Sequence, residues 1–446
     1  MKEAHPLEKT VGMELYSTDC EGFGGRLKKR YEDFLVEEIT TDNEILSFKE
    51  WSNQPPGEPT LEGKKKKYVS FTVQKMGFST MDASTIIASS LRLPRNLVSY
   101  AGLKDKRAVT VQRMTAPTRA ASGLGTLELT NIEIRDIQYS KKLVQIGDLL
   151  GNRFSILLRD LDVSLDEALE ISEEVRSTPL LNYFGIQRFG IARPNTHIAG
   201  KHLIERDFEG MIRTILCMPG EYENQELLDA RVELADSLTP TEKIIEVFPK
   251  DLHYERTVMY ELMKHPDEFK RAVTRIPPRI LTLMVHAYQS FLFNHLLSAR
   301  VKSGMSYVIP EPGDFLLALN EIQSGPDSWL YVTESTLEER RRQVSEMEYA
   351  LALPSPGYGT RLPPTKQSEM LKEILKSEEI TLKDFRDSQM RSIDAPGGFH
   401  RTSITLPDWD ASIQDEGLLV KFSLRKGSYA TVVLRELMKN HPINRI

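Results

Sequence analysis

The chain has 446 residues, of which 40% are hydrophobic and 27% charged, and its formal net charge is −6. These values are typical of a globular protein with two or three domains, and no apolar run reaches the ~18–20 residues of a membrane-spanning helix. Cys20 and Cys217 are too few and too far apart for a disulfide framework or a cysteine-based zinc site. The charged N-terminal segment also disfavours a secretion signal, so we expect a cytoplasmic protein.

A negative net charge is unfavourable for binding a polyanion, but the charge is unevenly distributed along the chain. Residues 21–119 carry more Lys and Arg than Asp and Glu, with clusters at Arg26–Arg30 and Lys64–Lys67, whereas 221–236 is acidic. This distribution fits one basic face on an acidic body. Taken alone, the Lys64–Lys67 run is better explained as a solvated loop.

The first 180 residues predict strands and helices in mixed order. Residues 68–73 alternate between apolar and polar side chains, which predicts a half-buried strand, and 79–91 has helical spacing after an N-cap serine. Residues 101–112 then form a loop between two extended pieces, where Gly102 allows the backbone to turn. A capping-box pattern predicts a helix after Ser164, and further strands are expected at 131–137, 141–150 and 153–161.

The rest of the chain is mainly helical until it nears the C-terminus. Residues 200–275 are acidic and mostly helical in pattern, 280–301 predicts a long helix, and 303–330 predicts loops with short strands. A charged helix is expected at 336–351, before breakers at 353–359, and a strand at 418–424 precedes a last helix. Strands at both ends without a regular βαβ order favour an α+β fold with a largely antiparallel sheet and a long insertion.

Common catalytic and cofactor motifs do not occur. The sequence lacks a P-loop, GxSxG and HExxH, and the glycines at 22–25 do not open a helix as a dinucleotide motif requires. His197 and His202 are close in sequence but have no clear third ligand. We therefore expect chemistry from ordinary side chains, with no metal and no cofactor.

Asp105, in the segment AGLKDKRAVTVQ (101–112), is the candidate nucleophile. Its neighbours Lys104, Lys106 and Arg107 favour the ionised carboxylate, the form that a covalent nucleophile needs. An isolated aspartate among lysines is more often a solvated turn residue, so the loop alone does not decide between these interpretations.

A set of five segments does favour the catalytic interpretation. Together they resemble, in order, the signatures of the TruD family of tRNA pseudouridine synthases, in the form with a long insertion found in archaea: RLKKRYEDFLVEEI (26–39), AGLKDKRAVTVQ (101–112), GNRFSILLRD (151–160), NYFGIQRFG (182–190) and LRKGSYATVVLREL (424–437). The resemblance implies an α+β pseudouridine synthase fold, whose mixed, mainly antiparallel sheet with a central cleft is interrupted by an inserted α/β (TRUD) domain. We expect the catalytic domain at 1–183 and 401–446 and the insertion at 184–400.

The resemblance also implies a reaction. Family members isomerise one uridine of tRNA to pseudouridine, typically at position 13 in the D arm, without metal or cofactor, and nothing in the sequence demands more than a monomer. Asp105 matches the family's nucleophile, which attacks either the ribose C1′ or the uracil C6.

Substrate-binding positions carry over one at a time. Phe154 matches the ring that stacks on the flipped uracil, and Asn152 matches an asparagine that contacts the substrate. Lys28 matches the basic partner of the nucleophile, with Lys29 and Arg30 as alternatives if the register shifts. The pocket-lining aromatics are Phe34 and Tyr429. Each ring could instead be plain core packing, and Asn152 could be a turn residue.

Two other functions remain open at this point. The chain could be a catalytically silent tRNA-binding or tRNA-folding protein on the same fold, or an RNA glycosidase that uses Asp105 without rejoining the base. In NYFGIQRFG, Arg188 could reach a phosphate or a carboxylate, while the remaining residues of the motif fit a structural role.

Overall fold

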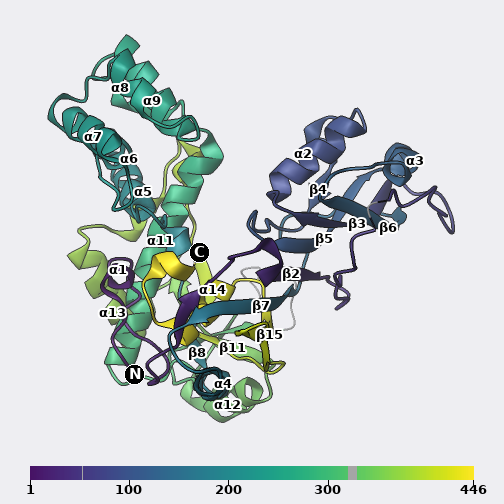
Figure 1. Cartoon of the computed structure of the whole chain (residues 1–446). Coiled ribbons are helices and arrows are strands. Elements are labelled where there is room, and N and C mark those ends of the chain that lie inside the picture. The colour runs from purple at the N-terminus through teal and green to yellow at the C-terminus, as the bar shows by residue number, and fades with distance from the viewer. Residues whose placement is uncertain (53, 320–328, 446) are drawn as a thin grey trace. The chain divides into compact units, whose positions relative to one another are not determined.

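In the computed structural model, residues 1–52, 54–319 and 329–445 are described, and the chain divides into two units (Figure 1). The sheet unit contains residues 18–180 and the C-terminal segment from 404, and the helical unit contains 1–17, 181–319 and 329–403. The first 17 residues thus belong with the helical unit, although the sequence groups them with 1–183. The identity of these units as a catalytic and an inserted domain stays a prediction.

In its described residues, the sheet unit is built on nine strands in the order β14-β15-β7-β2-β5-β3-β6, with β1 beside β7 and β4 beside β5. Strands β2 and β5 are parallel, and the other pairs are antiparallel. This mixed, mainly antiparallel sheet agrees with the predicted fold class. The strands are β1 (Gly24–Arg26), β2 (Phe34–Ile39), β3 (Tyr68–Met76), β4 (Ser99–Tyr100), β5 (Val109–Pro117), β6 (Ile132–Ser140), β7 (Gly151–Leu161), β14 (Asp410–Gln414) and β15 (Gly417–Arg425).

One transverse row of side chains defines the working face of this sheet. Lys75 pairs with Thr110, Thr110 with Val36, Val36 with Phe154, and Phe154 with Phe422. Directly paired residues project to the same side of a sheet, so all five side chains share one face. From β15 to β3 the row changes from apolar to polar.

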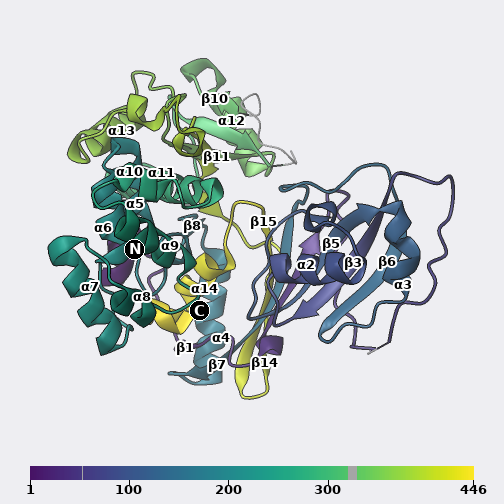
Figure 2. The same ribbon diagram turned by 90° about the horizontal axis from the view of Figure 1, so that it is seen from above.

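Two groups of helices cover different parts of this same face. Helices α2 (Thr80–Ser90) and α3 (Ala121–Gly125) pack on the apolar residues of β3, β5 and β6. Helices α4 (Leu165–Ser177) and α14 (Ala430–Met438) pack on β7 and β15. Figure 2 shows α2 over β3 and β5. The polar part of the row, on β3 and β5, therefore lies between two apolar clusters.

The opposite face of the sheet carries its own buried polar groups. The segment 46–52 runs across it, and the backbone N–H groups of Phe48 and Lys49 donate to Glu37 and Gln74 at 2.7 and 3.0 Å. Arg153 Nε donates to the second oxygen of Glu37 at 2.6 Å. These contacts pair the side chains of Glu37 and Gln74 within the sheet unit.

The helical unit packs around the long helix α11 (Pro278–Lys302), which contacts α5, α13 and β11. A four-stranded antiparallel sheet in its described residues has the order β10-β9-β11-β12. No helix among the residues described is long and apolar enough to cross a membrane. The other elements are α1 (Pro6–Lys9), α5 (Thr196–Glu205), α6 (Phe208–Leu216), α7 (Gln225–Ser237), α8 (Glu242–Val247), α9 (His253–Lys264), α10 (Phe269–Val273), β9 (Phe315–Ala318), β10 (Trp329–Tyr331), α12 (Leu337–Ser345), β11 (Tyr349–Ser355), α13 (Lys366–Ser377) and β12 (Gly398–Arg401), with β8 (Leu180–Leu181) and β13 (Ser403–Ile404) where the chain passes between units.

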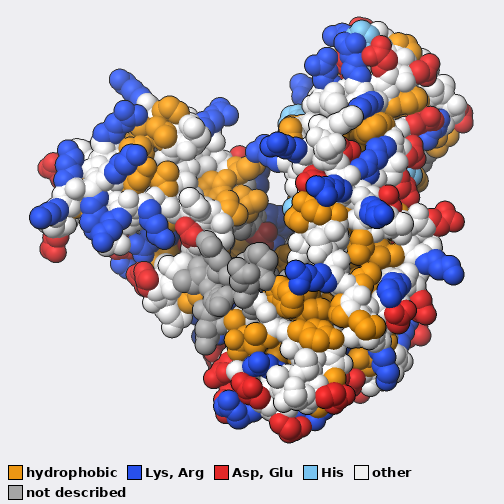
Figure 3. All heavy atoms as spheres, turned by 180° about the vertical axis from the view of Figure 1, so that it is seen from behind, with side chains coloured by type: hydrophobic (Ala, Val, Ile, Leu, Met, Phe, Trp, Pro, Cys, Tyr) orange, Lys and Arg blue, Asp and Glu red, His pale blue; other side chains and the backbone are white. Residues whose placement is uncertain are grey.

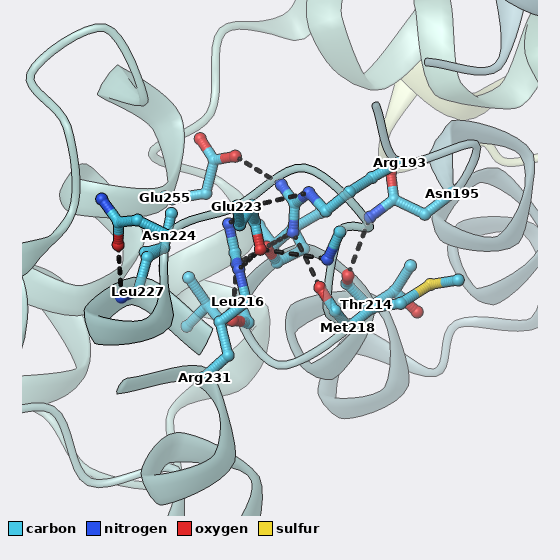
Figure 4. Close-up of polar contacts among 12 residues, drawn as sticks. Arg193, Asn195, Thr214, Leu216, Met218, Glu223, Asn224, Leu227, Arg231 and Glu255 are labelled. Carbon is cyan, nitrogen blue, oxygen red and sulfur yellow. Dashed lines mark hydrogen bonds and ion pairs between the residues drawn. The ribbon is translucent and has the colours of Figure 1, made fainter. Parts of the chain in front are cut away.

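A buried ion-pair network joins the helices of residues 193–255 (Figure 4). Arg231, with no exposed side-chain surface, donates to both oxygens of Glu223 at 2.6 and 2.7 Å and to the carbonyl oxygens of Ile215 and Leu216. Arg193 lies 3.2 Å from Glu255 and 3.5 Å from Glu223. These contacts compensate two largely buried guanidinium groups, and they have no counterpart in the sequence analysis.

The segment NYFGIQRFG lies mostly in the interior of the helical unit. Tyr183 and Phe189 are fully buried. The side-chain amide of Asn294 accepts a hydrogen bond from Phe184 N–H and donates one to the Phe184 carbonyl. Gly190 has a φ of 98°, where only glycine is unstrained. These contacts agree with the structural interpretation of the motif, and a phosphate contact by Arg188 stays a prediction.

Several predicted elements are confirmed, among them the strand from Tyr68, the helix capped by Ser79 and the long helix α11. The strand expected at 141–150 is wrong. Val144 N–H donates to the side-chain hydroxyl of Thr115 on β5, and Gly147 N–H donates to the Ala101 carbonyl in a loop, so the segment does not pair with a strand through its backbone.

The helix expected at 336–351 ends at Ser345, and the chain enters β11 at Tyr349, which continues through the first of the supposed breakers. Pro354 lies within β11 but beyond Ala352, where the pairing with β9 ends. Of the stretch 303–330, residues 320–328 lie outside the described residues.

Candidate active site

Asp105 sits in the loop between β4 and β5, and this loop is anchored at several points. Thr80, the first residue of α2, accepts a hydrogen bond from Lys104 N–H at 2.8 Å. Gln112 on β5 donates to the Gly102 carbonyl at 3.2 Å. The ammonium of Lys104 lies 2.9 Å from Glu38, and both side chains are almost fully buried. The loop is therefore held on β2, β5 and α2.

Gly102 does not turn the loop in the way the sequence suggests. Its φ is not positive, and a Cβ built there would meet only the Lys104 ammonium, at 3.7 Å. The hydrogen bonds to Thr80 and Gln112, and not a special glycine conformation, determine the course of the loop.

The Asp105 carboxylate projects toward a buried lysine. Its Oδ2 is 3.3 Å from Lys28 Nζ, with the Asp105 side chain 47% exposed and the Lys28 side chain 4% exposed. The ammonium also lies 4.4 Å from the centre of the Phe34 ring. The buried ammonium thus holds the carboxylate in one direction by an ion pair.

The backbone of Lys28 is held in an unusual conformation. Its φ of 54° lies in the left-handed region, which a lysine adopts at a cost of order 1–3 kcal/mol. Arg107, from the Asp105 loop, donates to the Lys28 carbonyl at 3.0 Å. The strain is thus maintained by a contact with the segment that carries the candidate nucleophile.

Lys28 is the one of the three basic residues whose side chain contacts the Asp105 carboxylate among the described contacts. The Lys29 ammonium donates to Asp160 at 2.7 Å, and the backbone N–H of Arg30 donates to Asp33. Of the three neighbouring basic residues, the geometry favours Lys28 as the partner of Asp105.

Phe154 lies at the apolar end of the working face. Its ring is 8% exposed, stacks on Phe422 at 5.5 Å between centres and meets Phe34 edge-on at 6.3 Å. The ring is thus part of the core between β2, β7 and β15. Phe154 follows Asn152 by two residues on β7, so both side chains project from the same face of the sheet.

Asn152 carries an unusual polar atom. Its Oδ1 is buried and accepts no hydrogen bond from any described residue. A buried acceptor left unpaired costs roughly 1–3 kcal/mol, so such an atom requires an explanation. Asn152 pairs with Glu38 on β2, whose carboxylate holds Lys104 of the Asp105 loop.

Tyr429 precedes α14 and is 36% exposed. It follows a turn whose Lys426 donates from its backbone to Leu150 and from its side chain to the Gly147 carbonyl. Gly147 in turn bonds to Ala101, at the start of the Asp105 loop. Three loops are thereby linked next to the candidate site.

The chain was compared with known protein families. The family model described as tRNA pseudouridine synthase D (TruD) matches residues 10–437. The chain belongs to the TruD family. Its predicted membership is therefore confirmed, and the family is one of isomerases.

Curated members of the TruD family cover nearly the whole chain. "Probable tRNA pseudouridine synthase D" of Methanosarcina acetivorans is 31% identical, over 99% of this chain and 98% of its own length. The protein of the same name from Methanococcus vannielii is 34% identical, over 96% and 99%. A crystal structure from Methanosarcina mazei, assigned as TruD, superimposes with a TM-score of 0.79 at 29% identity and covers 99% of this chain and 100% of that one. The predicted fold class is thus confirmed.

Within this TruD family member, sequence reasoning missed part of the site. Lys75, Thr80 and Glu38 contact the Asp105 loop but were not singled out. A signal existed for Lys75: it continues the alternation of Val69, Phe71 and Val73, so an inward lysine could have been noticed. Among the described residues, no group of three or more His, Cys, Asp or Glu side chains could hold a metal ion.

Proposed function

We propose that this chain converts a uridine of tRNA to pseudouridine, at position 13 in the D arm, with Asp105 as the nucleophile. The observation that supports this most is the half-exposed Asp105 carboxylate, 3.3 Å from the buried Lys28 ammonium. Lys28 would orient the carboxylate, as a nucleophile requires.

The reaction is an isomerisation, so every atom of the uridine is retained. The carboxylate adds to C1′ of the ribose or to C6 of the uracil, and the bond between C1′ and N1 breaks. The base turns, C5 bonds to C1′, the proton on C5 leaves, and N1 takes up a proton. Release of the carboxylate restores Asp105.

The uridine must first leave the RNA stack, which costs a few kcal/mol. The Phe154 ring offers a platform that returns ~1–3 kcal/mol through stacking. The buried, unpaired Oδ1 of Asn152 is suited to accept the N3–H of uracil. Phe34, beneath the Lys28 ammonium, and Tyr429, at the linked loops, are the other proposed pocket residues.

Lys and Arg side chains gather on the part of the sheet unit built around α2, α3 and β6 (Figure 3). The exposed basic residues of this region include Lys64, Lys65, Arg92, Arg95 and Lys141. They would contact tRNA phosphates, and their binding would weaken as salt rises. A tRNA substrate fits the expected cytoplasmic location, and a monomer suffices because all proposed site residues belong to one unit of one chain.

The test is pseudouridine mapping on an unmodified tRNA transcript. Wild type should form pseudouridine at position 13, and Asp105→Asn should form none while still binding tRNA. Asp160→Asn is the matched control, because Asp160 is also exposed and pairs with the neighbouring Lys29. Binding without product in wild type would indicate a silent tRNA-binding protein, and release of free uracil would indicate a glycosidase.

A further inference from the structure

Lys75 is a buried lysine that the proposed mechanism does not use. It lies on β3 with no exposed surface. Its ammonium donates to the carbonyl oxygen of Phe78 at 2.7 Å and to that of Asp105 at 3.2 Å. One of its two acceptors is therefore the backbone of the candidate nucleophile.

A lysine is costly at this position. The inward residues that precede it on β3 are Val69, Phe71 and Val73, all in the apolar cluster under α2. Burying an ammonium against carbonyl oxygens, which carry only partial charge, leaves much of its desolvation uncompensated. An apolar side chain would continue the cluster at lower cost, so stability of the sheet does not account for the cation.

We propose that Lys75 is a positioning residue for Asp105. Its ammonium fixes the carbonyl of the nucleophile and thereby the direction of the carboxylate, and it adds positive charge next to the loop. Lys28 holds the carboxylate of Asp105, and Lys75 holds the backbone of the same residue. This inference rests on the proposed role of Asp105.

The charges around Lys75 are consistent with a group that titrates near neutral pH. Burial lowers its pKa to about 8, while the Asp105 carboxylate raises it, Lys104 lowers it and Asp82 of α2 raises it. Its strand neighbour Thr110 is uncharged. As pH rises through about 8 the ammonium becomes an amine, which can still donate hydrogen bonds but no longer supplies the charge.

Single-turnover kinetics test the positioning role. Lys75→Met should lower the rate of pseudouridine formation about 10–100-fold, as for a slightly misplaced nucleophile, with the Kd for tRNA unchanged. The wild-type rate should fall above about pH 8, and Lys75→Met should lack that step. Arg159→Met is the control: it removes another largely buried cation of the sheet unit, one that pairs with Asp33.

A Lys75→Met rate equal to wild type would overturn the proposal. So would equal losses of rate and stability in Lys75→Met and Arg159→Met, since that would indicate a structural role alone. A Kd that rises while the turnover rate stays constant would overturn it as well.

A measurement without catalysis separates this inference from the proposed function. In NMR of lysine-labelled protein, Asp105→Asn should lower the pKa of Lys75, because the carboxylate that stabilises its charge is gone. Lys75→Met identifies the signal by its loss. An unchanged pKa overturns the coupling even in an active enzyme. Absence of pseudouridine in wild type overturns the proposed function, while a lowered pKa would still support the coupling of Lys75 to Asp105.

Discussion

Phe154 offers the sharpest separation of a binding role from a packing role. The ring is 8% exposed and stacks on Phe422, which is fully buried one strand away. Both residues thus belong to one core, and both lie on the working face of the sheet. If Phe154 is the platform for the flipped uracil, its loss should affect turnover, whereas the loss of Phe422 should affect stability alone.

The burial of Phe154 determines which substitution is informative. Phe154→Ala would cost ~3–5 kcal/mol of folding stability, as is usual for a core phenylalanine, and would obscure any effect on turnover. Phe154→Leu keeps most of the apolar volume and should cost about 1.5 kcal/mol or less. It removes the aromatic face, and with it stacking worth ~1–3 kcal/mol. Since 1.36 kcal/mol in the activation free energy corresponds to a tenfold change in rate, the turnover rate should fall roughly 5–150-fold.

Pseudouridine formation under single-turnover conditions and urea unfolding would be measured on Phe154→Leu and Phe422→Leu. The two variants should lose similar stability, and only Phe154→Leu should slow turnover by the stated factor. Equal slowing in both variants would show that the effect passes through the core, and no slowing in Phe154→Leu would refute the platform role.

Three further predictions concern the helical unit. Glu223→Gln should lower the free energy of unfolding in urea by ~3–5 kcal/mol, because it leaves Arg231 buried and partly uncompensated. Glu209→Gln is the control and should cost little, because Glu209 forms an exposed ion pair. An equally small loss in both variants would contradict this prediction. Burial lowers the pKa of His400 to about 3, so the neutral ring stabilises the fold above pH 6.5 and this contribution is lost as pH falls toward 3. Between pH 7 and 5 the stability should drop by about 2 kcal/mol more in wild type than in His400→Phe, and equal slopes would exclude His400 as the cause. Gly200→Ala places a Cβ 2.0 Å from the Met284 carbonyl oxygen of α11 and should lower Tm by several degrees (a loss of ~1–3 kcal/mol), while Gly398→Ala, with open space around it, should not.

Alternation and motif order predicted much of the sheet unit because these signals are local. Val69, Phe71 and Val73 place β3 and its inward face, and the five family segments occur on β2, the Asp105 loop, β7 and β15 of the sheet unit and in the buried 182–190 segment. The failure at 141–150 has a non-local cause. That segment has apolar residues in alternation, yet its N–H groups bond to Thr115 and Ala101, residues that a local pattern does not bring near.

The choice among Lys28, Lys29 and Arg30 could not be made from the sequence. It depends on a left-handed backbone at Lys28, which no local preference of lysine predicts and which a contact from Arg107 stabilises. The same holds for the network of Arg193 and Arg231. Charged side chains in a sequence predict a solvated surface, and only the fold shows that these two are buried.

The negative net charge of the chain seemed to oppose an RNA partner, but the charges of the candidate site give a different balance. Lys28, Lys75 and Lys104 are all buried there. Of the carboxylates that act on them, Glu38 is buried, Asp105 is half-exposed and Asp82 is exposed. The buried part of this charge is therefore positive, in a poorly solvated region where its field is weakly screened. This buried positive charge would favour an RNA phosphate near the site. Binding of RNA should therefore depend on the charges close to the site more than on the net charge of the whole chain, because salt screens charges separated by more than a Debye length of ~8–10 Å.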